Sequence, residues 1–218
     1  FDIPHIQIVR IGTKMPAFNP HRILEDAELP RLISRYSQGR RRIYIMTHFN
    51  HPKEITEPAA EAVERLARAG ATLCNQTPMI HGVNDSPETL AKLFQTLAAI
   101  GDPPYYVFQC RPTLGNRPYA VPLARALAVF QEARSRVGGL AKRARLVMSH
   151  ATGKIEILGM DTAHFFLRYH RAPDPAMESR IFLARRDDSA YWFDDLQFPG
   201  GSPASPAHTR SRSCWNRT

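Results

Sequence analysis

The sequence has few cysteines, and none of them lie close together. The 218 residues contain three, Cys74, Cys110 and Cys214. This spacing provides neither a disulfide framework nor a CxxC metal-binding pair, and it is typical of a protein from a reducing cytosol. We therefore expect a cytoplasmic protein with no metal ligands in this chain.

Long hydrophobic runs are also absent. No stretch reaches the roughly 18 consecutive apolar residues of a membrane-spanning helix, so we expect no membrane partner. The chain begins without an initiator methionine, and Asp2 and Pro4 interrupt any apolar run of a signal peptide. We expect a portion of a longer protein, beginning within a strand.

Acidic residues are in the minority. The chain has 29 Lys and Arg against 20 Asp and Glu, a net charge of +9. Residues 199–218 contain three Arg and no acid, and their Pro, Ser and Gly content predicts a disordered tail. No nucleic-acid-binding motif accompanies the charge, and the aromatic residues do not alternate with basic ones. The basic balance therefore favours a surface suited to small anionic ligands.

What the sequence does have is a repeated alternation of strands and amphipathic helices over residues 5–137. The predicted strands are residues 6–12, 42–49, 71–80 and 104–110, and the predicted helices are about 24–37, 57–69, 87–97 and 121–137. This alternation predicts a parallel sheet with right-handed crossovers. Without a GxGxxG motif, it favours a (β/α) barrel over a dinucleotide-binding fold. Four units cannot close a barrel of about 250 residues, so we expect an incomplete barrel over residues 1–137.

The periodicity changes after Gly138 and Gly139. Short runs follow at residues 144–150, 154–160, 163–170, 180–186 and 190–196, and several alternate apolar and polar residues. Such alternation is typical of half-buried antiparallel strands. The predicted fold class is therefore α/β, an incomplete parallel (β/α) barrel followed by a β-rich segment at residues 138–198.

Polar side chains occur where each of the four predicted parallel strands ends. In barrels of this kind, reactive groups come from these strand ends and the loops after them. The residues are Arg10, Thr13, Lys14, His48, Asn50, His51, Asn75, Gln76, Gln109, Cys110 and Arg111. Each has an ordinary structural interpretation, such as turn formation by Asn. Only their convergence predicts a binding site, and it specifies no reaction.

Three successive motifs resemble one enzyme family. THFNHPKEIT (47–56), NQTPMIHGVND (75–85) and YYVFQC (105–110) resemble segments of the lysine 2,3-aminomutase family of radical SAM enzymes. IVRIGTK (8–14) resembles a strand of the same family, and the resemblance covers about residues 3–160 in unbroken order. It implies a barrel of the radical SAM type, a [4Fe–4S] cluster that cleaves S-adenosylmethionine to a 5′-deoxyadenosyl radical, and pyridoxal phosphate that carries the migrating amino group.

The resemblance also implies roles for individual residues. Gln76 matches a family position that hydrogen-bonds S-adenosylmethionine, and His48 matches a strand end facing the same cofactor. Lys154 occupies the place of the lysine that binds pyridoxal phosphate covalently, although the family's Gly-rich run before it is two residues longer. Such a lysine needs a neutral amine and hence partial burial or a cationic neighbour, and His150 and Arg145 are near in sequence. The structural alternative is that these side chains hold their own loops.

Two departures from the family bear on cofactor and substrate. The cluster-binding CxxxCxxC motif is absent, so these residues alone cannot hold the cluster, and we expect that motif upstream of Phe1. Lysine-selecting members place Asp at the positions of Arg111 and Ser149. Arginine repels a substrate ammonium and favours a carboxylate, so we expect an amino-acid substrate other than L-lysine, bound by Arg111 and Ser149. Association of identical copies is compatible with the sequence.

Three hypotheses about function stay open at this point. The first is an aminomutase-like radical SAM isomerase that uses pyridoxal phosphate. The second is a radical SAM relative without pyridoxal phosphate, or a truncated inactive remnant, and the shortened loop before Lys154 motivates it. The third is a basic nucleic-acid-associated protein, which depends on charge alone.

Overall fold

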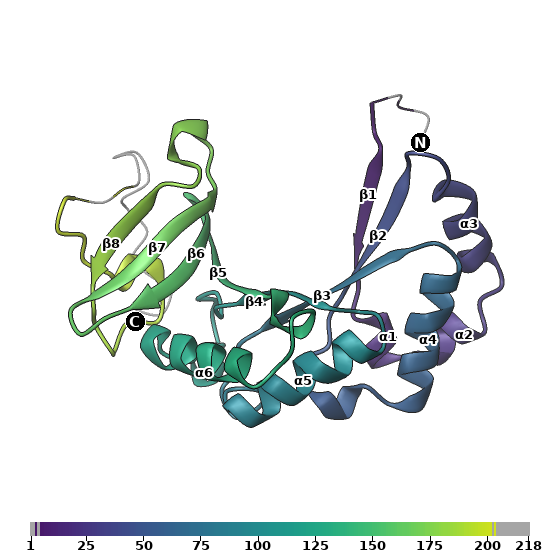
Figure 1. Cartoon of the computed structure of the whole chain (residues 1–218), viewed down its shortest axis with the longest axis horizontal. Coiled ribbons are helices and arrows are strands. Elements are labelled where there is room, and N and C mark those ends of the chain that lie inside the picture. Colours follow the sequence, from purple (N-terminus) through teal and green to yellow (C-terminus); the bar gives the residue numbers. More distant parts are fainter. Residues whose placement is uncertain (1–2, 4, 202, 204–218) are drawn as a thin grey trace. The chain divides into compact units, whose positions relative to one another are not determined.

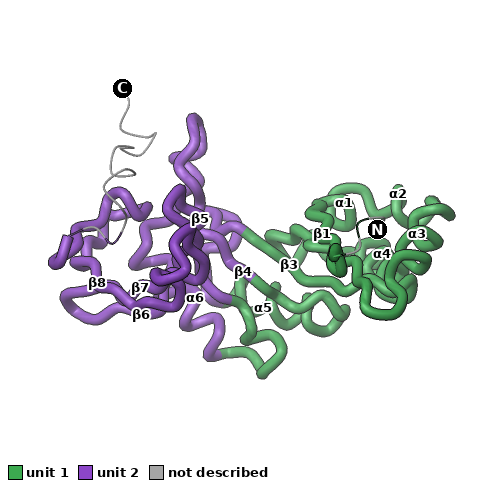
Figure 2. Tube along the Cα trace, turned by 90° about the horizontal axis from the view of Figure 1, so that it is seen from above, with its two compact units in different colours: residues 1–77, 88–105, 136–144 green, residues 78–87, 106–135, 145–218 purple. Residues whose placement is uncertain are grey.

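The computed structural model of the chain describes residues 3, 5–201 and 203, which form two compact units. The first unit comprises residues up to 77, 88–105 and 136–144, and the second comprises residues 78–87, 106–135 and 145 onward (Figure 2). Eight strands follow one another in a sheet in the order of the sequence (Figure 1).

The strands are β1 (Ile8–Gly12), β2 (Arg42–Thr47), β3 (Thr72–Pro78), β4 (Pro104–Phe108), β5 (Arg145–His150), β6 (Gly153–Met160), β7 (His164–Arg171) and β8 (Ile181–Arg185). The α-helices are α1 (Met15–Phe18), α2 (His21–Leu24), α3 (Glu28–Tyr36), α4 (Glu57–Arg68), α5 (Pro87–Ala99) and α6 (Leu123–Ser135). Short 3₁₀ helices are η1 (Pro52–Glu54), η2 (Arg117–Tyr119), η3 (Ala141–Arg143), η4 (Pro175–Met177) and η5 (Phe193–Asp195).

In the first unit, β1, β2 and β3 are parallel. Ile8 pairs with Arg42 in β2, and Tyr44 pairs with Thr72 in β3. Burial alternates along β3 and over the first four residues of β2, and one face carries the most buried residues, Ile43, Ile45, Thr47, Leu73 and Asn75. Helices α3 and α4 lie beside these strands and bury their own apolar face, which includes Ile33, Val63 and Leu66 (Figure 1). This packing leaves the other face of the strands for the candidate site.

The end signals of α4 act as the sequence predicts. The Thr56 hydroxyl accepts a hydrogen bond from the Ala59 amide at 3.4 Å, Pro58 lies in the first turn, and Gly70 follows with φ +100°. The single helix predicted at about residues 24–37 is wrong at its start. Asp26 accepts hydrogen bonds from the Glu28 and Leu29 amides at 2.8 and 3.0 Å, so a new helix, α3, begins there.

In the second unit, β4 and β5 are parallel, and β5, β6, β7 and β8 are antiparallel neighbours. Strand β5 therefore takes part in both kinds of pairing. Its buried apolar residues Leu146 and Met148 share a core with Ile155, Leu167 and the buried face of α6. The fold class predicted from the sequence, an incomplete parallel β/α sheet followed by antiparallel strands, is confirmed. Among the described residues β1 pairs with β2 alone, so the sheet is open.

The last predicted β-run, residues 190–196, is not a strand. It contains the 3₁₀ helix η5, because the Asp195 carboxylate accepts hydrogen bonds from the Tyr191 and Trp192 amides, both at 3.0 Å, and closes a turn. Residues 202 and 204–218 of the predicted disordered tail lie outside the described residues. In the part of the chain that the structure describes, none of the helices has the length and apolar character needed to cross a membrane.

Candidate functional site

The loop after β2 is held by an ion pair in the first unit. Lys14 Nζ donates to Glu54 Oε1 at 2.7 Å and to the His48 carbonyl oxygen at 2.9 Å. The other oxygen of Glu54 accepts from the Asn50 amide at 2.5 Å. Although burial opposes ionisation of Glu54, the hydrogen bonds from Lys14 and the Asn50 amide hold its pKa below the ordinary value. The loop between β2 and α4 is thereby fixed beside the end of β1.

His48 and Gln76 leave the same face of the first unit. Met46 and Cys74 are register partners in β2 and β3, and His48 and Gln76 each follow two residues later. Because side chains alternate along a strand, both point away from the helix-covered face. Burial, and then the charge of Lys14, lower the pKa of His48, so its ring is neutral at neutral pH. Two hydrogen-bonding side chains therefore follow neighbouring strands at corresponding positions, and one of them, His48, is neutral.

Asn75 faces the opposite way and has a structural role. Its side-chain oxygen accepts from the Phe49 amide at 2.7 Å, and its side-chain nitrogen donates to the Phe49 carbonyl at 3.1 Å. The neighbouring Thr47 hydroxyl donates to the buried carboxylate of Asp102. Burial raises the pKa of Asp102 to about 7, against which the Thr47 hydrogen bond acts. Asn75 is thus part of the buried support for the strand ends.

In the second unit, one face of β4–β7 carries interacting polar side chains, which we call the polar face. It consists of Tyr106, Arg145, Ser149, Lys154, Glu156, Arg168 and His170. Lys154 is the register partner of Ser149, and Glu156 is the partner of both Val147 and Arg168. Residues directly opposite in a sheet lie on one side of it, so these side chains are brought together by the hairpins.

Lys154 of the polar face lies over two aromatic rings of β4. Its Nζ is 4.2 Å from the centre of the Tyr106 ring and 5.3 Å from that of Phe108. The Tyr106 hydroxyl is 2.7 Å from His170 Nε2, and Arg145 is 2.9 Å from His170 Nδ1. Because arginine can only donate, Nδ1 accepts and Nε2 carries the ring proton. Burial, and then the Arg145 charge, lower the pKa of His170, which keeps this arrangement neutral.

Glu156 joins two arginines on the polar face. Its buried carboxylate is 2.7 Å from Arg168 and 4.0 Å from Arg145. The polar face thus carries three basic side chains, those of Arg145, Arg168 and Lys154, and one acidic side chain, that of Glu156. The excess positive charge lies near aromatic rings. Such a donor set suits an anionic, planar ligand that an amine can reach, because guanidinium groups bind phosphate and carboxylate oxygens in pairs.

The remaining candidates in the second unit have mixed placements. His150 lies on the other face of β5 from Ser149 and Lys154, so it is not a neighbour of the lysine on the polar face, whereas Arg145 shares that face. Arg111 is exposed in the loop after β4, where its carbonyl oxygen accepts from Asn116. Gln109 is buried and donates to the Val121 and Tyr191 carbonyls at 2.6 and 3.0 Å, which is a structural role.

No group of three or more His, Cys, Asp or Glu side chains suited to a metal ion occurs in the described ranges. Cys74 and Cys110 are free, and burial raises the pKa of each thiol. These residues do not fit the thiolate ligation of a [4Fe–4S] cluster.

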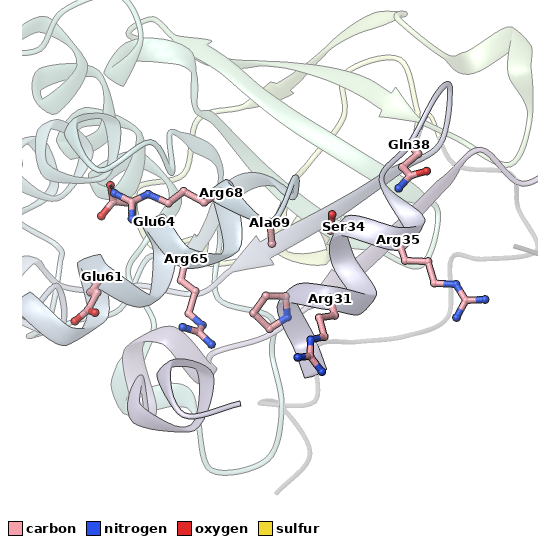
Figure 3. A pocket seen from close by; sticks show the side chains of 10 residues that line it. Arg31, Ser34, Arg35, Gln38, Glu61, Glu64, Arg65, Arg68 and Ala69 are labelled. Atoms are coloured by element: carbon pink, nitrogen blue, oxygen red, sulfur yellow. Dashed lines mark hydrogen bonds and ion pairs between the residues drawn. The ribbon is translucent and has the colours of Figure 1, made fainter. Parts of the chain in front are cut away.

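A cavity of about 760 Å³ lies between α3 and α4 in the first unit (Figure 3). Arg31 and Arg68 at its rim pair with Glu28 and Glu64 of their own helices, at 2.8 and 2.6 Å. Exposed pairs of this kind are ordinary features of a solvated helix surface. Because none of the residues singled out from the sequence lines it, this cavity is separate from the candidate site.

Sequence reasoning missed Glu54, Glu156, Arg168 and His170. For Glu54 a signal exists, because its carboxylate and the His51 ring form a capping box around η1. The other three come together only through cross-strand register, which the sequence pattern does not specify.

Comparison with known proteins identifies relatives, although no protein-family profile matches. A protein of Aquifex aeolicus (strain VF5) named "Putative L-lysine 2,3-aminomutase" is 50% identical over 195 residues, which cover 89% of this chain and 52% of that protein. The L-lysine 2,3-aminomutase of Acetoanaerobium sticklandii is 36% identical over 138 residues, 63% of this chain and 32% of the relative. The glutamate 2,3-aminomutase of Clostridioides difficile is 35% identical over 140 residues, 64% of this chain and 32% of the relative.

These similarities show that the chain is related to the amino-acid 2,3-aminomutases. Its motifs indicate the same relation to the lysine 2,3-aminomutase-like proteins. The chain spans about half the length of the first relative and about a third of the other two.

Proposed function

We propose that this chain is part of a radical SAM amino-acid 2,3-aminomutase in which Lys154 binds pyridoxal phosphate. The observation that carries the proposal is the position of Lys154 on the polar face, with its amine over Tyr106 and beside the Arg145–His170 pair. Arg145 supplies the cationic neighbour that a covalently modified lysine needs. Arg145 and Arg168 supply donors for a phosphate.

Each cofactor has a place in this proposal. Pyridoxal phosphate, when bound, carries the migrating amino group, and S-adenosylmethionine supplies the radical with a reduced [4Fe–4S] cluster. In this proposal His48 and Gln76 provide neutral hydrogen-bonding groups for S-adenosylmethionine. They do so on the face of β2 and β3 that the helices of the first unit leave uncovered. The described residues supply no ligand set for the cluster, so its cysteines would have to come from other residues.

Covalent labelling tests the role of Lys154. The sequence has five lysines, Lys14, Lys53, Lys92, Lys142 and Lys154. In the natural protein that contains this chain, borohydride reduction in the presence of pyridoxal phosphate should fix the cofactor on Lys154, as read by peptide mass spectrometry. Lys154→Ala should abolish that label, and Lys92→Ala, at an exposed position of α5, should leave it unchanged.

Two results would count against this proposal. A label that stays after Lys154→Ala, or that sits on another lysine, places the cofactor elsewhere. An unlabelled protein that still cleaves S-adenosylmethionine is a radical SAM relative without pyridoxal phosphate, the alternative suggested by the shortened loop.

We also propose an acidic amino acid as substrate, with Arg111 and Ser149 in place of the acids that select lysine. A hydrogen bond to a charged group contributes about 1.5–3 kcal/mol, or roughly ten- to a hundred-fold in selectivity. Arg111→Asp should therefore lower kcat/KM for L-glutamate by about that factor and raise it for L-lysine. Arg180→Asp, an exposed charge reversal in the same unit, is the control. Faster turnover of L-lysine than of L-glutamate by the unmodified enzyme would contradict the assignment.

A further inference from the structure

A chain of hydrogen bonds lies behind the turn that precedes Lys154. The Tyr169 hydroxyl donates to Thr152 Oγ1 at 3.0 Å, and Thr152 Oγ1 is 2.8 Å from His150 Nδ1. His150 Nε2 is 3.1 Å from Asp194 Oδ1. These four residues connect β7, the β5–β6 turn and η5, which are far apart in the sequence.

The geometry determines which His150 nitrogen carries the proton. The Thr152 amide donates to Nδ1 at 3.2 Å, so Nδ1 is an acceptor. The ring proton therefore lies on Nε2 and is donated to the Asp194 carboxylate. The pair holds the ring in one orientation, and the Thr152 backbone is tied to that ring.

The His150 part of this chain of hydrogen bonds is shielded from water, and Asp194 forms its more exposed end. The His150 side chain is 5% exposed and that of Asp194 is 21% exposed. The Phe193 ring centre is 4.7 Å from that of His150, and Trp192 is also buried against this region. A charge-assisted hydrogen bond with one partner buried in this way is stronger than a pair in which both partners are exposed.

The backbone conformation of the β5–β6 turn is tightly restricted at Gly153. Gly153 has φ +136°, and a side chain there would overlap the Arg171 carbonyl oxygen. The next residue, Lys154, pairs with Ser149 and Arg171. Fixing Thr152 on one side of Gly153 therefore fixes the direction in which Lys154 leaves the strand toward the polar face.

We infer that His150 and Asp194 are positioning residues for Lys154, acting from the opposite face of the hairpin. This positioning role deepens the proposed function. It rests on the proposed function only for the chemical role of Lys154. Nothing in the sequence suggests this arrangement, because Asp194 lies 44 residues from His150.

The test reads the hairpin and the lysine without any cofactor. In the natural protein that contains this chain, Asp194→Ala removes the acceptor, and Asp194→Asn retains an acceptor oxygen for the His150 proton. Asp194→Ala should speed hydrogen exchange of the amides of residues 149–155 by about tenfold or more, the effect of one lost charged hydrogen bond. The rate of reductive methylation of Lys154 should change several-fold, whereas that of Lys92 should not.

The matched control is Asp188→Ala, which removes an exposed ion pair with Arg186 in the same unit and should leave both measurements unchanged. Asp194→Asn should restore most of both. The inference is overturned if Asp194→Ala leaves the exchange or the Lys154 methylation rate as it was. It is also overturned if Lys92 changes equally, which would report general unfolding. Failure of the proposed function would appear separately, as absence of cofactor on Lys154 in the unmodified protein.

Discussion

Replacing Asp102 by asparagine should stabilise the protein progressively more as the pH rises from 5 to 8, by about 2–3 kcal/mol over that interval. Burial raises the pKa of Asp102 to about 7, well above that of an unfolded chain. The contribution of this group to stability is therefore fully present below the unfolded pKa and is lost as the pH rises through about 7. A tenfold difference in acidity between the folded and the unfolded state corresponds to about 1.4 kcal/mol of unfolding free energy.

Asparagine resembles the protonated acid in shape and charge. The variant therefore does not lose unfolding free energy at this position as the pH rises. Its oxygen can accept from the Thr47 hydroxyl as Asp102 does. Urea unfolding at pH 5, 6, 7 and 8 measures the difference in unfolding free energy between variant and wild type. Glu61→Gln, an exposed substitution on α4, controls for loss of a surface carboxylate. A difference that stays constant across this range would mean that Asp102 is ionised in the folded protein throughout.

A second large effect is expected at Gly153. Its φ of +136° is rarely adopted by residues with a side chain, and an alanine Cβ would overlap backbone atoms of Arg171. Gly153→Ala should therefore lower the unfolding free energy by about 3 kcal/mol or more, since strain and overlap add. The measurement is urea unfolding, with hydrogen exchange at Lys154 reporting local loss of β6–β7 pairing.

The same strand provides the control for Gly153. Gly159 has no positive φ, and an added Cβ there would meet only the Gln131 side chain at 4.0 Å. Gly159→Ala should cost less than about 1 kcal/mol, the ordinary range for a tolerated substitution. Equal costs at the two positions would show that the β5–β6 turn adapts to a side chain.

The alternation of strands and helices could be predicted because it depends on local periodicity. The helix α4 shows this well, since Thr56, Pro58 and Gly70 each act within a few residues of their position. The start of α3 was missed because Asp26 interrupts an otherwise helical pattern with its own backbone hydrogen bonds. Local side-chain competition with the backbone is weakly encoded in hydrophobic spacing.

Only some residues of the candidate site can be predicted from the sequence, namely those at strand ends or within family motifs. Lys154, His48 and Gln76 were identified in this way, and the assignment of their roles stays a prediction. The side of the sheet that each residue faces depends on the strand register. The register places Arg145 on the same face as Lys154 and His150 on the opposite face. Buried partners such as Asp102 have no sequence signal at all, because an isolated Asp is usually exposed.

The agreement between strand order and chain order has a consequence for biosynthesis. Each strand from β2 to β8 is hydrogen-bonded to the strand made just before it. A new strand therefore finds its neighbour already formed as the chain leaves the ribosome, and no pairing must wait for a distant segment. In the antiparallel hairpins from β5 to β8 the partners are also close in the sequence, which favours fast folding and shortens the time during which strand edges are exposed to other chains.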